Sequence, residues 1–182
     1  IGREKVWMKN FENEGSTLWN INSENEMIQD SIFRRGQNAL LHIRSPESPN
    51  NIVTNLEDRL PFDNQKQHSL HGYIKTENAK NVSIEARLSV GRTGESLITA
   101  SIGDSVSGSL NWKKYWNDIP YTEEAEFFDI RSNSDIPDSG LAYSWFDDVG
   151  FIEWDTLKLI TEYPISINYP NDYDYIQFYH DQ

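Results

Sequence analysis

Two adjacent aspartates, Asp147 and Asp148, interrupt an otherwise apolar segment of the chain. Buried carboxylates are costly unless they accept hydrogen bonds or bind a cation. Glycoside hydrolysis needs two carboxylates at a fixed separation in a cleft. Neighbouring residues of a β-strand point to opposite faces, so this pair is not expected to supply them. We therefore expect the two aspartates either to cap backbone amides at a bulge or to bind a cation.

The other residues that could do chemistry do not form a recognisable catalytic pattern. The four histidines show no metal-ligand spacing; they are His42, His68, His71 and His180. Each histidine is expected at the surface or at a sheet edge, and the acids within 123–126 are expected to be solvated in a polar turn. The chain has no cysteine, no nucleophile motif and no phosphate-binding loop. No catalytic residue is therefore predicted.

The charge balance restricts the partners. The formal net charge is −13, from 29 acidic and 16 basic residues. A protein that follows a phosphate backbone needs a basic stripe, whereas here the basic doublets Arg34–Arg35 and Lys113–Lys114 are expected at solvated edges. No run approaches the ~18 apolar residues of a membrane span. Nucleic acid and membrane insertion are thus disfavoured, while neutral sugars, cations and protein partners stay open.

The hydrophobic periodicity is that of strands, and residues 82–90 show it most clearly. The apolar set, expected in the core, is Val82, Ile84, Ala86, Leu88 and Val90. The polar set, expected in water, is Ser83, Glu85, Arg87 and Ser89. A period of two indicates a strand with one buried face. Residues 96–102 repeat the pattern after two glycines, which predicts a hairpin.

The rest of the chain predicts an all-β protein. Further strands are expected at Ala39–Arg44, His68–Lys75, Ala125–Arg131, Leu141–Trp154 and Leu157–Glu162, with one short helix near Leu56–Leu60. Leu141–Trp154 is apolar on both faces, as in a central strand that is covered on both sides. Short strands joined by polar turns favour a two-sheet antiparallel β-sandwich of the jelly-roll kind. We assign it to residues 1–162, and residues 163–182 to a C-terminal hairpin or the start of a following domain.

Five motifs in order carry a family resemblance. They are Asn10 to Gly15 with Trp19, Arg35 to Leu40, Gly72 to Asn78, Trp112 to Tyr115, and Trp145 to Phe151. This order resembles the carbohydrate-binding modules of the family 4, 9, 16 and 22 type, within the galactose-binding-like jelly rolls. The resemblance covers roughly Val6 to Trp154, and folds of this class host unrelated functions.

The resemblance implies two sites. A structural calcium would join the start of the domain to its last strand, with Glu12 and Asp147 as ligands and backbone carbonyls completing its six to eight oxygens. A glycan would stack on exposed rings, for which the candidates are Trp116, Tyr115, Tyr121 and Tyr143. Three further tryptophans match positions that are usually core in such folds: Trp19, Trp112 and Trp145.

Two functions follow from these features. The first is a non-catalytic carbohydrate-binding module of a larger exported bacterial protein, which holds neighbouring domains near an oligosaccharide or polysaccharide. The second is an extracytoplasmic structural or protein-interaction sandwich with no sugar affinity. In either case the chain is expected outside the cell, at the cell surface or in the periplasm.

Overall fold

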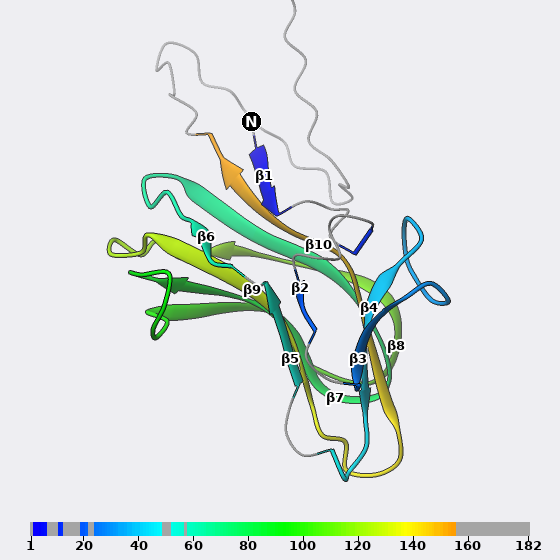
Figure 1. The fold of residues 1–182 in the computed structure, drawn as a ribbon. Helices are drawn as coiled ribbons and strands as arrows, with labels where there is room; N and C mark the ends of the chain where they lie inside the picture. Colours follow the sequence, from blue (N-terminus) through cyan, green and yellow to red (C-terminus); the bar gives the residue numbers. More distant parts are fainter. Residues whose placement is uncertain are drawn as a thin grey trace, which may run out of the picture.

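The structure is a computed structural model that describes residues 2–6, 11–12, 19–21, 24–48, 52–56 and 58–155. The strands are β1 (Gly2–Val6), β2 (Trp19–Asn20), β3 (Glu26–Gln29), β4 (Ala39–Arg44), β5 (Ile52–Leu56), β6 (Leu60–Pro61), β7 (Gln67–Ser89), β8 (Ile98–Ile119), β9 (Phe127–Asp135) and β10 (Ala142–Trp154). All their pairings are antiparallel (Figure 1). The predicted all-β class is confirmed. The helix predicted near Leu56–Leu60 is wrong, because that stretch joins β5 to β6.

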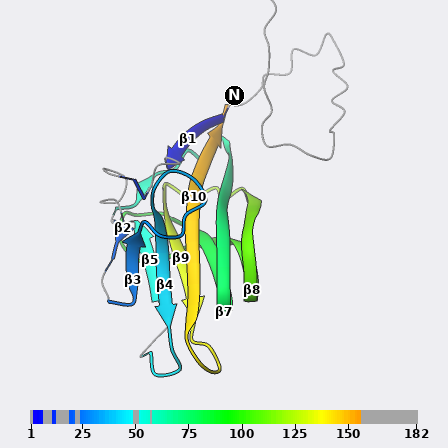
Figure 2. The same ribbon diagram turned by 90° about the vertical axis from the view of Figure 1, so that its right-hand side faces the viewer.

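One strongly curled sheet supplies both layers of the fold. The first part of β7 pairs with β10, which continues to β4 and β3, while the last part of β7 pairs with β9, which continues to β5 and β2. Along its other edge β7 pairs with β8 over both parts. Figure 2 faces the half formed by β3, β4, β10, β7 and β8. The two long strands therefore pass from one half of the sheet into the other.

The bend in β7 and β8 coincides with residues in the left-handed backbone region. These are Asn78 and Asn81 in β7, with φ of 51° and 45°, and Gly103, Ser105 and Gly108 in β8. Asparagine tolerates this region better than most residues, and glycine adopts it without steric cost. The register between the two strands shifts at the same place, as expected for bulges that bend a strand.

The core lies between the two halves. Phe128 of β9 stacks on Phe151 of β10 with ring centroids 4.0 Å apart, and Phe62 lies 6.4 Å from each of them. Strands β9 and β10 do not pair with each other, so this stacking crosses the interior. Burial of three large rings at one point makes it the densest aromatic contact between the halves.

Polar side chains also join the halves. His42 of β4 is fully buried and its Nδ1 lies 2.9 Å from Ser134 Oγ of β9, while Arg44 Nη2 donates to Ser134 O at 2.8 Å. Burial lowers the pKa of His42 to about 3, so its imidazole is neutral at physiological pH. The prediction of surface or edge histidines is wrong for His42, His68 and His71, all of which are buried.

The period-two prediction holds for the core face of β7 and fails for its other face. The apolar positions from Val82 to Leu88 are buried, whereas Val90 is exposed beyond the end of the strand. Ser83, Glu85 and Ser89 are buried, although the alternating pattern predicted that they face solvent. Glu85 pairs with Arg131 of β9, and such cross-strand ion pairs shield the outer surface of this half.

Strand β10 lies between β7 and β4 and is buried along most of its length, which confirms the predicted central strand. Among the described residues there is no helix long and apolar enough to cross a membrane. The predicted strand Leu157–Glu162 and the hairpin within 163–182 lie outside the described residues. The division into residues 1–162 and 163–182 stays a prediction.

Candidate functional site

The outer surface of the half shown in Figure 2 carries a row of aromatic side chains, which we call the aromatic face. Leu70 and Ile74 of β7 point into the core, so His71 and Tyr73 point outward. Directly paired residues share a face, and the register of β8 and β10 against β7 therefore gives the other members. The aromatic face consists of Trp154, Trp116, His71, Tyr73, Trp145 and Tyr143. Two of these rings are almost fully buried, His71 at 6% and Trp145 at 4% exposed, and the burial of Trp145 agrees with the core position expected for it.

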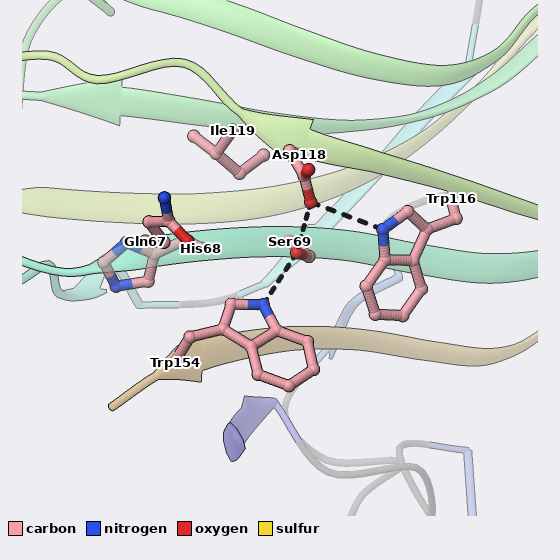
Figure 3. Close-up of a pocket in the computed structure, with 7 residues that line it drawn as sticks. All are labelled: Gln67, His68, Ser69, Trp116, Asp118, Ile119 and Trp154. Atoms are coloured by element: carbon pink, nitrogen blue, oxygen red, sulfur yellow. Dashed lines mark hydrogen bonds between the residues drawn. The ribbon is translucent and has the colours of Figure 1, made fainter. Parts of the chain in front are cut away.

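One end of the aromatic face is hollowed. The hollow has a volume of about 270 Å³ and is lined by Gln67 and Ser69 of β7, Trp116 and Asp118 of β8, and Trp154 of β10 (Figure 3). Chain segments far apart in sequence thus meet at the ends of three neighbouring strands. We call this feature the tryptophan hollow; His68 and Ile119 also contribute to its wall.

Hydrogen bonds hold the two indole rings of the hollow in place. Trp154 Nε1 donates to Ser69 Oγ at 2.8 Å, and Ser69 Oγ donates to Asp118 Oδ1 at 2.7 Å (Figure 3). Trp116 Nε1 lies 3.4 Å from the same Oδ1. The ring centroids of the two tryptophans are 6.2 Å apart and their planes are inclined by 50°. The rings are fixed by their neighbours before any ligand arrives.

The Trp116 ring packs on a neighbouring side chain and remains accessible to solvent. His71, opposite it in the register, stacks on it with centroids 5.6 Å apart and planes inclined by 11°, and Lys114 Nζ lies 5.8 Å from its ring. The residue nevertheless keeps 44% of its surface exposed. Trp116 is thus a large aromatic side chain that is held in one orientation and still reaches solvent.

The four predicted ligand-binding residues do not gather at one place. Trp116 lies in the tryptophan hollow, whereas Tyr115 has the opposite parity on β8 and packs against the core. Tyr121 follows β8 in the next turn and is 71% exposed. Tyr143 lies at the far end of the aromatic face, where it stacks on Trp145 with centroids 5.8 Å apart.

Two residues of the hollow, Trp154 and Asp118, were not predicted. They are 36 residues apart in sequence and meet because each pairs with the start of β7. Strand pairing of this kind cannot be read from a local sequence pattern. Part of the signal was nevertheless in the sequence. Asp118 lies two residues after Trp116 on a strand, so their side chains had to share a face.

A second polar cluster fixes the loop between β3 and β4, residues 30–38, which crosses in front of β4 and β10 in Figure 2. Asp147 Oδ2 accepts hydrogen bonds from Arg34 N at 2.7 Å and Arg35 N at 3.0 Å, and Asp148 forms an ion pair with the Arg34 guanidinium. Both aspartates therefore reach the same loop. The expectation that they point to opposite faces is wrong, because a bulge breaks the alternation of β10 at Asp147–Gly150.

Comparison with known proteins identifies this fold. No family model and no curated protein matches the sequence. Among solved structures, a family 4 carbohydrate-binding module matches with a TM-score of 0.52 and 9% identity, over 78% of this chain and 98% of that one. The chain shares the fold of carbohydrate-binding modules.

Two longer proteins contain the same fold as one part. The xylanase 10B of Clostridium thermocellum, whose family 22 module and family 10 catalytic module were solved with xylohexaose, matches with a TM-score of 0.52 and 9% identity. The match spans 83% of this chain and 28% of the xylanase chain. The enzymatically active domain of bacteriophage CBA120 tailspike protein 4 matches with a TM-score of 0.55 and 13% identity. There 80% of this chain spans 20% of the tailspike.

The calcium expected in a carbohydrate-binding module was placed on Glu12 and Asp147. Glu12 Oε1 accepts hydrogen bonds from Gln37 N at 2.7 Å and Asn38 N at 2.8 Å, and Oε2 accepts from Asn38 Nδ2 at 3.0 Å. Asp147 likewise faces N–H donors. Calcium needs oxygen ligands, so the described surroundings of the two carboxylates do not fit it. Instead, Asp147 holds the middle of the β3–β4 loop and Glu12 holds the end that leads into β4. The calcium site that the resemblance implies stays a prediction.

Asp147 gives a pH-dependent prediction. Burial raises its pKa from 3.8 to about 6, although backbone hydrogen bonds from Arg35 and Arg34 oppose the rise. The folded state then binds more protons than the unfolded state between these values, so this contribution to stability falls as pH rises from about 4 to about 6. Relative to Asp147→Asn, the wild-type protein is expected to lose free energy of unfolding over this range, measured by denaturant titration.

The test is how the difference in free energy of unfolding between the two proteins changes with pH. The size of that difference at any one pH is not informative, because the variant also changes a hydrogen bond. A difference between the two proteins that stays constant from pH 4 to pH 6 would contradict the raised pKa. If Asp147→Asn does not fold, the carboxyl carbon of Asp147 can be followed by NMR in the wild-type protein. A titration midpoint near pH 4 for this carbon would likewise contradict the raised pKa of Asp147.

Proposed function

We propose that this chain is a non-catalytic carbohydrate-binding module that holds a sugar ring in the tryptophan hollow. The observation that supports it is the pair of fixed indole rings, one of them widely exposed, beside the Asp118 carboxylate. A pyranose ring has apolar C–H faces that pack on indole and hydroxyl groups that donate to a carboxylate. Binding sites for small molecules combine apolar walls with a few placed polar groups in this way.

The hydrogen bonding of Asp118 leaves room for a sugar hydroxyl. The bonds that this carboxylate accepts from Ser69 and Trp116 both end on Oδ1. Oδ2 is therefore the acceptor that a ligand would use. Because Trp154 and Trp116 are already ordered by this network, little conformational entropy is lost when the ligand binds, which favours affinity.

Charge favours a neutral glycan. The chain carries a net charge of −13, and one of its acidic groups, Asp118, lies inside the hollow. A polyuronate or a sulfated polysaccharide would meet repulsion, since like charges within about a Debye length of 8–10 Å are only partly screened. The neutral xylohexaose bound by the xylanase whose fold this chain shares is consistent with this choice.

We propose that the hollow binds a glycan without hydrolysing it. Glycosidases place two carboxyl groups about 5–9.5 Å apart across the scissile bond. Asp118 is the one carboxylate among the described residues that line the hollow. In a larger exported protein, a module of this kind would keep a neighbouring domain close to its glycan.

Affinity electrophoresis on a panel of soluble polysaccharides tests the proposal. At least one neutral polysaccharide, such as a β-glucan, xylan or galactan, is expected to retard the protein, while a polyuronate is expected to leave its mobility unchanged. An unrelated protein of similar charge serves as the control for sieving. Absence of retardation on every neutral polysaccharide would reject the sugar site and favour the structural or protein-interaction role.

A further inference from the structure

The aromatic face consists of two groups of rings that lie in line along the strands. The first group is Trp154 and Trp116 in the tryptophan hollow. The second is Trp145 and Tyr143, which stack on each other and are paired in register with Lys75 and Glu77 of β7. Trp116 is paired with His71, so Trp145 lies four β7 residues further on, about 13 Å along the strand. Trp145 is only 4% exposed, so the half-buried Tyr143 is the ring that the second group could offer to an extended sugar chain.

Arg34 occupies the position between the two groups. Its guanidinium carbon lies 3.5 Å from the centroid of the Tyr73 ring. Tyr73 lies midway along β7 between His71 and Lys75, the register partners of Trp116 and Trp145. A ring covered by a guanidinium cannot also stack on a sugar, so Arg34 interrupts the aromatic face where an extended chain would have to pass.

The obstruction is anchored at several points. The Arg34 guanidinium pairs with the buried carboxylate of Asp148, and its backbone N–H donates to Asp147. At the end of the loop that leads into β4, Glu12 accepts hydrogen bonds from the backbone N–H groups of Gln37 and Asn38, and any side chain at Gly36 would clash with the Glu12 carboxylate. Moving Arg34 aside would leave a buried carboxylate unpaired, which is strongly unfavourable.

We infer that the tryptophan hollow is a closed-ended site for the terminus of a glycan chain or a short oligosaccharide, with Arg34 as the residue that sets this limit. The inference rests on the proposed function, whose site it refines. The hollow accepts the terminal rings of the chain, and the rest of the glycan leaves on the side away from Tyr73. The second aromatic group, Trp145 and Tyr143, does not contact the ligand in the wild-type protein.

The test is the dependence of affinity on chain length, measured by calorimetry with an oligosaccharide series from the polysaccharide that retards the protein. For the wild type, affinity is expected to stop rising after the first two or three sugar units. Arg34→Ala removes the guanidinium from the Tyr73 ring. The affinity of this variant is expected to keep rising with chain length, to about ten times the wild-type value for the longest members. Arg92→Ala is the matched control, because that guanidinium lies 5.4 Å from the ring of Phe127 on the other half of the sheet.

A second set of variants keeps the test valid if Arg34→Ala folds poorly. The double variant Arg34→Ala/Asp148→Asn removes the unpaired buried charge as well. In either background, adding Tyr143→Ala is expected to abolish the gain for long chains, whereas Tyr143→Ala alone is expected to leave wild-type binding unchanged.

The outcomes separate the inference from the proposed function. If affinity in the wild type rises steadily with chain length, or if Tyr143→Ala alone weakens binding, the closed end is wrong while sugar binding stands. An Arg34→Ala protein that folds and shows the wild-type length dependence also rejects the role of Arg34. Absence of binding to every saccharide overturns both.

Discussion

Replacing Trp116 by alanine is expected to weaken glycan binding about thirty-fold, the largest single effect in the tryptophan hollow. Truncation of a central aromatic anchor typically costs ~2 kcal/mol or more, and each 1.4 kcal/mol changes the dissociation constant about tenfold. Trp116 is the most exposed ring of the hollow, and its removal also takes away one of the two indoles that line it. Calorimetric titration with the retarding glycan measures the change.

Tyr121→Ala is the control for this substitution. Tyr121 is 71% exposed and does not line the hollow, so its loss is expected to leave the dissociation constant within about twofold of the wild type. Trp116 lies on an edge strand and keeps 44% of its surface exposed, so thermal unfolding should show little change in either variant. Full affinity in Trp116→Ala would place the sugar elsewhere and reject the site.

Replacing Phe151 by alanine is expected to destabilise the protein by ~3–5 kcal/mol, the usual cost of emptying the site of a buried phenylalanine. Phe151 is fully buried and stacks on Phe128 of the opposite half at 4.0 Å, with His68 5.3 Å away on the same side of the sheet. The cavity would lie between the two halves. Equilibrium denaturation in urea measures the loss.

Phe33→Ala provides a matched control, since Phe33 is 41% exposed in the β3–β4 loop. The same chemical change there is expected to stay within ~0.5 kcal/mol of the wild type. A loss of less than 1 kcal/mol for Phe151→Ala would mean that the two halves do not depend on this aromatic contact.

The sequence predicted those strands whose buried faces repeat clearly with the pleat, whereas several short strands and the part of β8 after residue 102 were not predicted. Ala39–Arg44 matches β4 in both bounds, and the predicted hairpin pairs Ile84 with Ile102 in β7 and β8. The central place of Leu141–Trp154 followed from its apolar character on both faces. These features depend on local composition, which a single sequence contains in full.

The candidate site was predicted only in part because it depends on register. Trp116 was named, but Trp154 was not, since the two rings meet through their common neighbour β7. The role of Arg34 was missed for the same reason: its contacts with Tyr73 and Asp148 cross 39 and 114 positions of the chain. A bulge at Asp147–Gly150 also overrode the alternation from which opposite orientations of the two aspartates were inferred.

The course of β7 and β8 has a consequence for dissecting the protein. Two of the three strand ends that form the tryptophan hollow, those of β7 and β8, belong to strands that continue into the other half of the sheet and cover its core. No cut between the halves leaves either one with a complete set of paired strands. The smallest fragment that can carry the site is therefore the whole curled sheet, and the site could not be transplanted as a short loop or a single hairpin.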